Sequence, residues 1–554
     1  MKISVKQFSS LLKIRNKEDF SREELFKITL FQKEHFFCQI SVLSEEHTFS
    51  TLSFKLEKEG REVPCDFISG YILENAVMDF PVYEDHDDDI ITDEPGLVPD
   101  ILRPFSERRM LSSRNLPASF VIEMEIPSDM AAGEYMLKTV VQTEEDNKRE
   151  PVFTEKELQL TVLPCKVPEE RIHFTQWFHV DCIAEYYHVP VYSEAHWSLI
   201  AAYMKAARKL GIDTILTPVL TPALDTRIGT RRLNTQLVKI RKEGEKFLFD
   251  FSLLSRYIDL ALLTGMKQLE ISHLFSQWGL KSAPNIFVTE NGTEKWYFGW
   301  HTDGHGEEYY GFLKQFVPAL VSFLEEKGVL SKCLFHLSDE PGEEALSNYK
   351  KAHDFIKPML KGRPIMDALS NVEFYRQGIP DIPVTAINHI EPFLRERAEN
   401  QWAYYCCSQY KEVGNRFMAF PSWRNRILGV QLYKFDIKGF LQWGFNFYHS
   451  AVSAYFINPY VSTSADRAHP SGDDFSVYPG ENGPLYSLRA LVFKEALSDA
   501  AILRALEEKK GREYVLRLID EEAGMEVTFK KYPRNASYIP RLMDRVKNEI
   551  AAAM

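Results

Sequence analysis

Residues 310–341, YGFLKQFVPALVSFLEEKGVLSKCLFHLSDEP, decide the fold class of this chain. Apolar residues recur at helical spacing until Gly328, and a glycine just past the last turn commonly ends a helix. The run CLFHLS at 333–338 then predicts a short buried strand, which two carboxylates and Pro341 follow. A helix that leads into a buried strand is the repeating unit of parallel α/β folds.

The same alternation of strand and helix continues on both sides of this segment. The predicted strands are IHFTQWF (172–178), DTILTPV (213–219), KQLEIS (267–272), CLFHLS (333–338), PIMDALS (364–370), PVTAIN (383–388), WAYYCC (402–407) and GFLQWGF (439–445). Eight such units over about 340 residues predict a (β/α)8 TIM-type barrel with long loops after the strands. A doubly wound open sheet is the alternative fold for this pattern.

The segment before the barrel has a different character. Short strands separated by turns, as in LPASFVIEMEI at 116–126, predict an all-β sandwich. A chain of 554 residues is also too long for a single hydrophobic core. We therefore expect a β-sandwich at 1–168, a catalytic (β/α)8 barrel at 169–510 and a helical C-terminal appendix at 511–554.

Composition excludes several classes of partner. The net charge is −13, with 79 acidic and 66 basic residues and no long basic run, which argues against nucleic acid and against anionic membranes. The sequence has neither the apolar stretch of a signal peptide nor one of about 20 residues that could span a bilayer, so we expect a cytoplasmic protein. The seven cysteines are scattered, without metal-ligand spacing, and predict neither a disulfide framework nor a metal site.

In a barrel of this kind, the active site lies at the carboxyl ends of the strands. The fourth strand ends in Asp339 and Glu340, which Pro341 follows. Two adjacent carboxylates at the mouth of the barrel indicate general acid/base chemistry. The alternative is that they cap the next helix, since aspartate is common at a helix start.

Aromatic and polar residues recur at the same end of the other strands. Each could be a packing residue, but together they predict a pocket with aromatic walls and a few hydrogen-bonding groups, as suits a carbohydrate. The candidate substrate-binding residues are Trp177, His179, Asp225, His273, Gln277, Trp278, Asn388 and Trp443. The expected partner is a glycan or a small glycoside.

The distribution of carboxylates limits which glycosidase mechanism the chain could use. A retaining glycosidase ordinarily needs a second carboxylate about 5–5.5 Å from the first, as nucleophile. In many barrel glycosidases that nucleophile ends strand seven, but here no carboxylate follows strand seven until Glu412. The pattern thus favours a substrate-assisted reaction, in which the 2-acetamido oxygen of the sugar attacks the anomeric carbon.

Two other functions remain open from the residues alone. A glycosidase of different sugar specificity could use a distant carboxylate, such as Glu270, Asp367 or Glu391, as its nucleophile. A non-catalytic carbohydrate-binding barrel would keep the aromatic residues, but it would not need Asp339 and Glu340 together.

Several segments resemble a known family. HLSDEP on strand four, GFLQWGFNFY at 439–448 and PSGDDFSVYPG at 470–480 are similar to the catalytic domain of glycoside hydrolase family 123 and to the related domain of unknown function 4091. The resemblance covers about residues 170–505. It implies a retaining exo-β-N-acetylgalactosaminidase without metal or cofactor. By position, Asp339 would stabilise the acetamido group and the oxazolinium intermediate, Glu340 would be the general acid/base and Trp443 would lie in the pocket.

Overall fold

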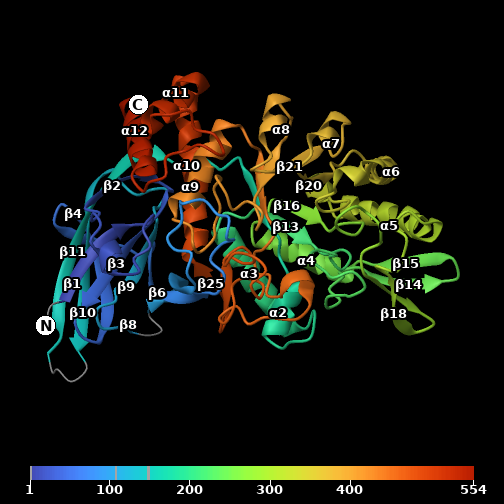
Figure 1. The fold of residues 1–554 in the computed structure, drawn as a ribbon, viewed down its shortest axis with the longest axis horizontal. Helices are drawn as coiled ribbons and strands as arrows, with labels where there is room; N and C mark the ends of the chain where they lie inside the picture. Colours follow the sequence, from blue (N-terminus) through green and yellow to red (C-terminus); the bar gives the residue numbers. More distant parts are fainter. Residues whose placement is uncertain (1–2, 106–108, 146–149, 554) are drawn as a thin grey trace.

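The computed structural model describes residues 3–105, 109–145 and 150–553, and Figure 1 shows their arrangement. The N-terminal part is mostly β, as the turn-rich sequence predicts. One sheet has the order β1-β3-β9-β6-β7-β25-β24 and the other β2-β11-β10-β4-β5, with β8 paired to β4. Alternate residues of both sheets, among them Ile40, Ile122, Leu56 and Leu158, are fully buried in one shared core.

The strands of these sheets have the following bounds: β1 (Ile3–Ser9), β2 (Lys27–Gln32), β3 (His35–Ser44), β4 (Thr48–Lys58), β5 (Arg61–Val63), β6 (Ile68–Met78), β7 (Gly96–Pro104), β8 (Met110–Ser112), β9 (Ala118–Glu125), β10 (Gly133–Glu145), β11 (Val152–Lys166), β24 (Val477–Gly480) and β25 (Gly483–Ser487). The last two come from the C-terminal half of the chain. Tyr486 on β25 lies opposite Leu102 on β7, so the N-terminal sheet is completed by strands that follow the barrel in sequence.

Eight parallel strands form the second half of the molecule, in the order β19-β16-β13-β12-β23-β22-β21-β20. Each coincides with one predicted strand, and only β21 begins outside its prediction, by one residue. The strands are β12 (His173–Gln176), β13 (Thr214–Thr217), β16 (Gln268–Ile271), β19 (Cys333–Phe335), β20 (Met366–Leu369), β21 (Ile382–Ala386), β22 (Trp402–Tyr404) and β23 (Gly439–Gln442). A single parallel bridge between Phe335 and Ile365 joins the two ends of the sheet. The barrel is therefore nearly closed, and the open-sheet alternative is wrong.

Helices lie between the strands and after them: α1 (Lys17–Phe20), α2 (Val180–Tyr186), α3 (Glu194–Lys209), α4 (Ser252–Leu263), α5 (Glu307–Glu326), α6 (Leu346–Ile356), α7 (Val372–Arg376), α8 (Glu391–Arg395), α9 (Trp423–Lys434), α10 (Leu488–Lys510), α11 (Arg512–Ala523) and α12 (Tyr538–Ala552). The last helix contacts the N-terminal part, because Lys547 forms an ion pair with Glu34. Figure 1 shows α12 close to β2. Within the described ranges, no helix has the length and apolar character needed to cross a membrane.

A four-stranded sheet that the sequence analysis did not predict projects from the barrel. Its strands β15 (Lys246–Asp250), β14 (Lys239–Glu243), β17 (Ile286–Glu290) and β18 (Thr293–Phe298) pair in that order. They belong to the loops that follow β13 and β16. Phe247 and Phe298 from this sheet each lie about 5 Å, centroid to centroid, from the ring of Phe312 on α5. The loops thus pack onto the barrel helices as ordered structure.

Candidate active site

A pocket of about 160 Å³ opens at the carboxyl ends of the barrel strands. Trp177, Trp278 and Trp443 form much of its aromatic wall, and Leu224, Ala368 and Leu441 add apolar surface. Asp225, Gln277, Asp339 and Glu340 supply polar groups. The structure thus brings together seven of the predicted site residues, which follow five different strands. These residues are Trp177, Asp225, Gln277, Trp278, Asp339, Glu340 and Trp443.

Asp339 and Glu340 lie immediately beyond β19. The peptide group between them is held from both ends, because Trp278 N–H donates to the Asp339 carbonyl (2.9 Å) and Glu340 N–H donates to the Ala368 carbonyl (3.1 Å). Asp339 is half-buried, whereas Glu340 is exposed towards the pocket and accepts a hydrogen bond from the Tyr404 hydroxyl. Burial, followed by the charges of Glu340 and Asp367, raises the pKa of Asp339 well above its usual range.

Three residues of the pocket wall have left-handed backbone conformations. The φ angles are +43° at Asp225, +57° at Trp278 and +42° at Glu340. A non-glycine residue rarely adopts this region, and such residues gather at active sites, where the surrounding structure holds them in place. At Glu340 the turn aims the carboxylate at the Tyr404 hydroxyl on β22. The two carboxylates therefore occupy a turn of the pocket wall, and neither caps a helix, since the next helical turn is capped by Gly342.

A layer of buried charges supports this turn from below. His336 has no exposed surface, and its Nε2 lies 2.7 Å from Glu270 Oε1 while its Nδ1 lies 2.9 Å from Asp367 Oδ1. Burial alone would lower the pKa of His336, but its hydrogen bonds to the two carboxylates raise that pKa to about 9. His336 is therefore an imidazolium at neutral pH, held between two carboxyl groups.

The carboxylates that the sequence left as alternative nucleophiles lie outside the pocket, two of them in this buried layer. Glu270 is fully buried and accepts hydrogen bonds from Thr175, Trp177 and His336. Asp367 is also fully buried, and Tyr349 and the backbone N–H groups of 337 and 338 bind it. Glu391 is exposed at the start of α8, where it pairs with Arg395. None of the three lines the pocket.

A comparison with known families settles the class of this protein. A model of the glycoside hydrolase 123 catalytic domain matches residues 177–506, which is more than half of the chain. The chain belongs to glycoside hydrolase family 123. It is therefore a glycoside hydrolase, with a glycan as the class of substrate, and the resemblance of its motifs is confirmed.

One solved structure agrees with the fold of this family 123 enzyme. A family 123 glycoside hydrolase from Clostridium perfringens, described in a study of glycolipid glycan hydrolysis, aligns with a TM-score of 0.76 at 18% identity over 99% of this chain and 98% of that one. β-Glucuronidases from Parabacteroides merdae (TM-score 0.30, 10% identity) and Bacteroides uniformis (TM-score 0.28, 11% identity) each cover 91% of this chain and 51% of their own, and are too distant to carry an argument. No curated protein matches the chain.

Three of the predicted substrate-binding residues do not line this pocket. His179 is buried behind it, where Nε2 is 2.9 Å from the Trp443 carbonyl and Nδ1 is 3.1 Å from Arg232. His273 is buried against His336, with ring centroids 4.3 Å apart, and burial together with the His336 charge lowers its pKa well below the usual value. Asn388 lines a neighbouring cavity. His179 and His273 therefore support the pocket wall of the family 123 enzyme from behind.

The structure also adds residues that the sequence analysis missed. Asp473 accepts a hydrogen bond from Trp443 Nε1 (2.9 Å), and His469, which lines the pocket, pairs with Asp474 (2.7 Å). Burial and the neighbouring Asp474 charge raise the pKa of Asp473 to about 6. All three lie in or next to the segment PSGDDFSVYPG, which contributed to the resemblance but was not connected to the strand ends.

Tyr404 could have been found from strand alternation. Residues two apart on a strand point to the same face. Trp402 and Tyr404 lie in the barrel interior with Leu216, Leu334 and Leu441, whereas Ala403 and Tyr405 pack outward. Because Tyr404 lies at the carboxyl end of β22 and faces the barrel interior, its hydroxyl lies at the pocket floor.

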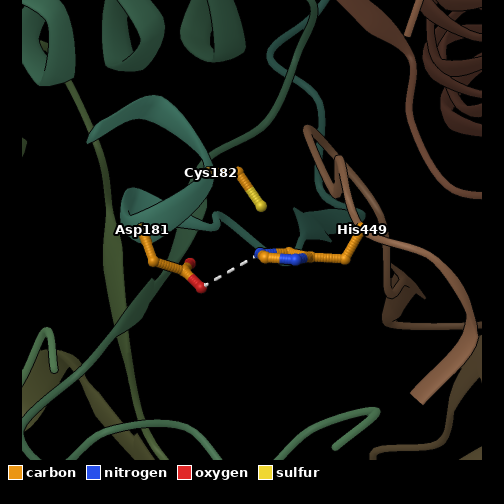
Figure 2. A group of neighbouring side chains, drawn as sticks. All are labelled: Asp181, Cys182 and His449. Atoms are coloured by element: carbon orange, nitrogen blue, oxygen red, sulfur yellow. Dashed lines mark ion pairs between the residues drawn. The ribbon is translucent and has the colours of Figure 1, made fainter. Parts of the chain in front are cut away.

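A second group of polar side chains lies behind the pocket. Figure 2 shows Asp181 and Cys182 at the start of α2 facing His449, whose Nε2 is 3.7 Å from Asp181 and 2.9 Å from Glu185. Ligand atoms of Asp181, Cys182 and His449 are close enough together to hold a metal ion. However, the guanidinium of Arg232 already binds both oxygens of Asp181 (2.7 and 2.8 Å) and reaches Cys182. A metal ion would face that cation at short range, so the group fits an ion-paired cluster better than a metal site.

Proposed function

We propose that this glycoside hydrolase removes a terminal β-linked N-acetylhexosamine, most suitably N-acetylgalactosamine, by a retaining, substrate-assisted mechanism. The supporting observation is the position of Asp339 and Glu340, which stand side by side on one turn of a tryptophan-lined pocket. We further propose that the nearly closed parallel barrel is a (β/α)8 catalytic domain that needs no metal or cofactor.

The two carboxylates suit different tasks. Asp339 is the more buried, so a charge there acts through a medium of low dielectric constant and can balance the positive charge that develops on the acetamido nitrogen. In the first step the acetamido oxygen bonds to the anomeric carbon while Glu340 donates its proton to the departing glycosidic oxygen. In the second step Glu340 takes a proton from water, which attacks the anomeric carbon and opens the oxazolinium ring.

The surroundings of the other carboxylates support this division. Glu270 and Asp367 are enclosed beneath the pocket by the hydrogen bonds described above, so neither can approach a sugar without breaking the His336 clamp. Asp225 lines the pocket, and its Oδ2 accepts the Val452 backbone N–H at 3.0 Å. Among the pocket-lining residues described, Asp225 is thus the competing candidate for a direct nucleophile.

The wall of the pocket supports a sugar as the group that binds. Pyranose rings present apolar C–H faces that pack on indole rings, and three tryptophans line this pocket. The related Clostridium perfringens protein is named for glycolipid glycan hydrolysis. On that analogy we propose that the N-acetylhexosamine of this substrate ends a glycan.

The decisive experiment compares 4-nitrophenyl β-glycosides that have or lack a 2-acetamido group. We expect hydrolysis of 2-acetamido-2-deoxy-β-galactoside and no turnover of the β-galactoside, because only the first carries its own nucleophile. Asp225→Asn is the matched variant, and it should retain the acetamido requirement. Equal turnover of both glycosides, abolished by Asp225→Asn, would assign the reaction to a direct nucleophile instead.

A further inference from the structure

The pocket wall contains a pair of adjacent cysteines that the proposed reaction does not use. Cys406 and Cys407 both line the pocket, together with Asp339 and Glu340. Both are free thiols, and both are partly exposed. Four of the other five cysteines are buried, and the fifth, Cys65, lies between β5 and β6 in the N-terminal part. The two pocket cysteines are therefore a pair that a small reagent from solvent can reach together.

The end of β22 explains how two consecutive side chains reach the same space. Along a strand, neighbouring residues point to opposite faces. β22 ends at Tyr404, and residues 406–409 form a turn in which the Gln409 N–H donates to the Cys406 carbonyl (3.1 Å). Cys407 lies inside this turn. Its side chain is therefore released from the alternation that would separate it from Cys406.

Buried side chains fix the backbone of this turn. The Cys406 N–H donates to Gln409 Oε1 (2.7 Å), and Asn415 Nδ2 donates to the Cys406 carbonyl (2.9 Å). Gln409 is only 3% exposed and Asn415 is fully buried. The first thiol of the pair is thus held at one place in the wall, two residues after the tyrosine that binds Glu340.

The two thiols interact with each other. Hydrogen bonding with the Cys407 thiol, followed by burial, raises the pKa of Cys406 well above its usual value. Burial and then the Cys407 thiol also raise the pKa of Tyr83, whose hydroxyl donates to the Ala468 carbonyl (3.3 Å). Because Cys406 holds its proton more firmly than an ordinary thiol, it is suited to react second, after its neighbour.

We propose that Cys406 and Cys407 are a dithiol oxidation site, which hydrogen peroxide or another two-electron oxidant converts into a disulfide that reversibly lowers the activity of the enzyme. First, the Cys407 sulfur attacks a peroxide oxygen and the O–O bond breaks, which gives a sulfenic acid and water. The Cys406 sulfur then attacks the sulfenic sulfur, the S–O bond breaks, and the S–S bond forms as a second water leaves. Two thiols are oxidised, and one peroxide is reduced to two waters.

The spacing of adjacent residues makes this disulfide reversible. Consecutive Cα atoms across a trans peptide bond are about 3.8 Å apart. In most disulfides the Cα atoms are about 4.4–6.8 Å apart, and bonds outside this range are strained and more easily reduced. A strained and accessible disulfide belongs to the labile, regulatory kind rather than to the structural kind.

The disulfide changes the pocket wall next to Glu340. Closing the ring pulls residues 406 and 407 out of the turn that Gln409 and Asn415 hold in place. Tyr404, which binds Glu340, lies on the same short segment. Because a displacement of about 1 Å in a site can cost about 10²-fold in rate, we expect oxidation to lower kcat/KM about tenfold or more.

The test treats the wild type with hydrogen peroxide, removes the excess with catalase, and measures the peptide masses and the activity. Activity is followed on the 4-nitrophenyl glycoside that the wild type hydrolyses. We expect the peptide with both cysteines to lose two hydrogen atoms, kcat/KM to fall, and dithiothreitol to reverse both changes. Cys406→Ser and Cys407→Ser should show neither reversible change. The matched control, Cys65→Ser, replaces a partly exposed cysteine elsewhere and should behave like the wild type.

The double variant Cys406→Ser/Cys407→Ser should keep the activity of its own untreated sample through the same treatment. An equal loss of activity in the wild type and the double variant would overturn the inference. Cysteines that gain oxygen without forming the disulfide, or a disulfide that leaves kcat/KM unchanged, would overturn it as well. The peptide masses need no substrate, so a failure of the proposed sugar specificity is distinguishable from a failure of the dithiol site.

Discussion

His336 provides a quantitative test of the charged layer beneath the turn that carries Asp339 and Glu340. The side chain is fully buried between Glu270 and Asp367, and its pKa rises from 6.5 to about 9 in the folded protein. A group with a raised folded pKa stabilises the fold fully below its unfolded pKa and loses that contribution as the pH rises through the folded value. The window for this loss therefore lies between about pH 6.5 and pH 9.

The size of the effect follows from the shift. At about 1.4 kcal/mol per pH unit, the change amounts to about 3 kcal/mol. For a barrel of about 340 residues the entropy of unfolding is about 0.7 kcal/mol per degree, so the wild-type melting temperature should fall by about 4–5 °C across this window. Replacing His336 with glutamine leaves two buried carboxylates without their cation, which typically costs about 3–5 kcal/mol, or about 4–7 °C.

The assay is the melting temperature of wild type and His336→Gln from pH 6 to pH 9.5, with His301→Gln, an exposed position, as control. His449 and His469 also have raised pKa values, so the informative quantity is the difference in slope between wild type and variant. The melting temperature of His336→Gln should be lower than that of wild type at pH 6, and it should fall by about 4 °C less between pH 6.5 and pH 9. Equal slopes would show that His336 is not protonated in the folded protein.

Activity supplies an independent readout of the same charge. The His336 charge lowers the pKa of Asp339, against the larger effects of burial and Glu340. Its removal should therefore move the acidic limb of the kcat/KM profile to higher pH, since more alkali is needed to ionise Asp339. A variant that is only less stable would lose activity without a shift of this limb.

Three further substitutions test the site. Asp339→Asn should lower kcat about 10²–10³-fold on the acetamido aryl glycoside, because it removes the charge that balances the acetamido nitrogen, and full activity would contradict the role. Glu340→Gln should slow poor leaving groups far more than activated ones across a series of aryl glycosides, and a uniform loss would argue against general acid catalysis. Asp79→Ala should lower kcat/KM about tenfold with an unchanged far-ultraviolet circular dichroism spectrum, because Asp79 binds the loop that carries His469 and Asp473. Activity equal to wild type would show that this loop holds its shape without Asp79.

The sequence predicts the strands of the barrel well, because each is a short apolar run that turns can bound on both sides. It also predicts that Asp339 and Glu340 lie at the pocket, since a strand end of a parallel barrel is a defined place in space. The sheet formed by β14, β15, β17 and β18 was missed. Its strands are short, charged and partly exposed, for example KIRKE at 239–243, and their pairing depends on loops from two different strands.

Most of the site features that the sequence could not predict depend on side-chain contacts between segments far apart in the chain. His179 and His273 lie at strand ends, as predicted, but whether such a residue faces the pocket or the layer behind it depends on its neighbours. His273 stacks on His336, which burial and two carboxylates hold in place. Glu270 and Asp367 looked available for chemistry because the sequence does not show that both bind one histidine.

The N-terminal sheets hold one loop of the pocket wall in place, a role that no strand pattern in the sequence reveals. Asp79 follows β6 and accepts hydrogen bonds from Ser462, Thr463 and Ser464, while Phe80 and Ser471 exchange two more. β24 and β25, on the other side of His469 and Asp473, extend the same N-terminal sheet. The loop between these anchors supplies His469 to the pocket wall and Asp473 to the Trp443 indole. The β-rich part therefore acts as the scaffold of one pocket wall, and the barrel alone would lack the contacts that fix it.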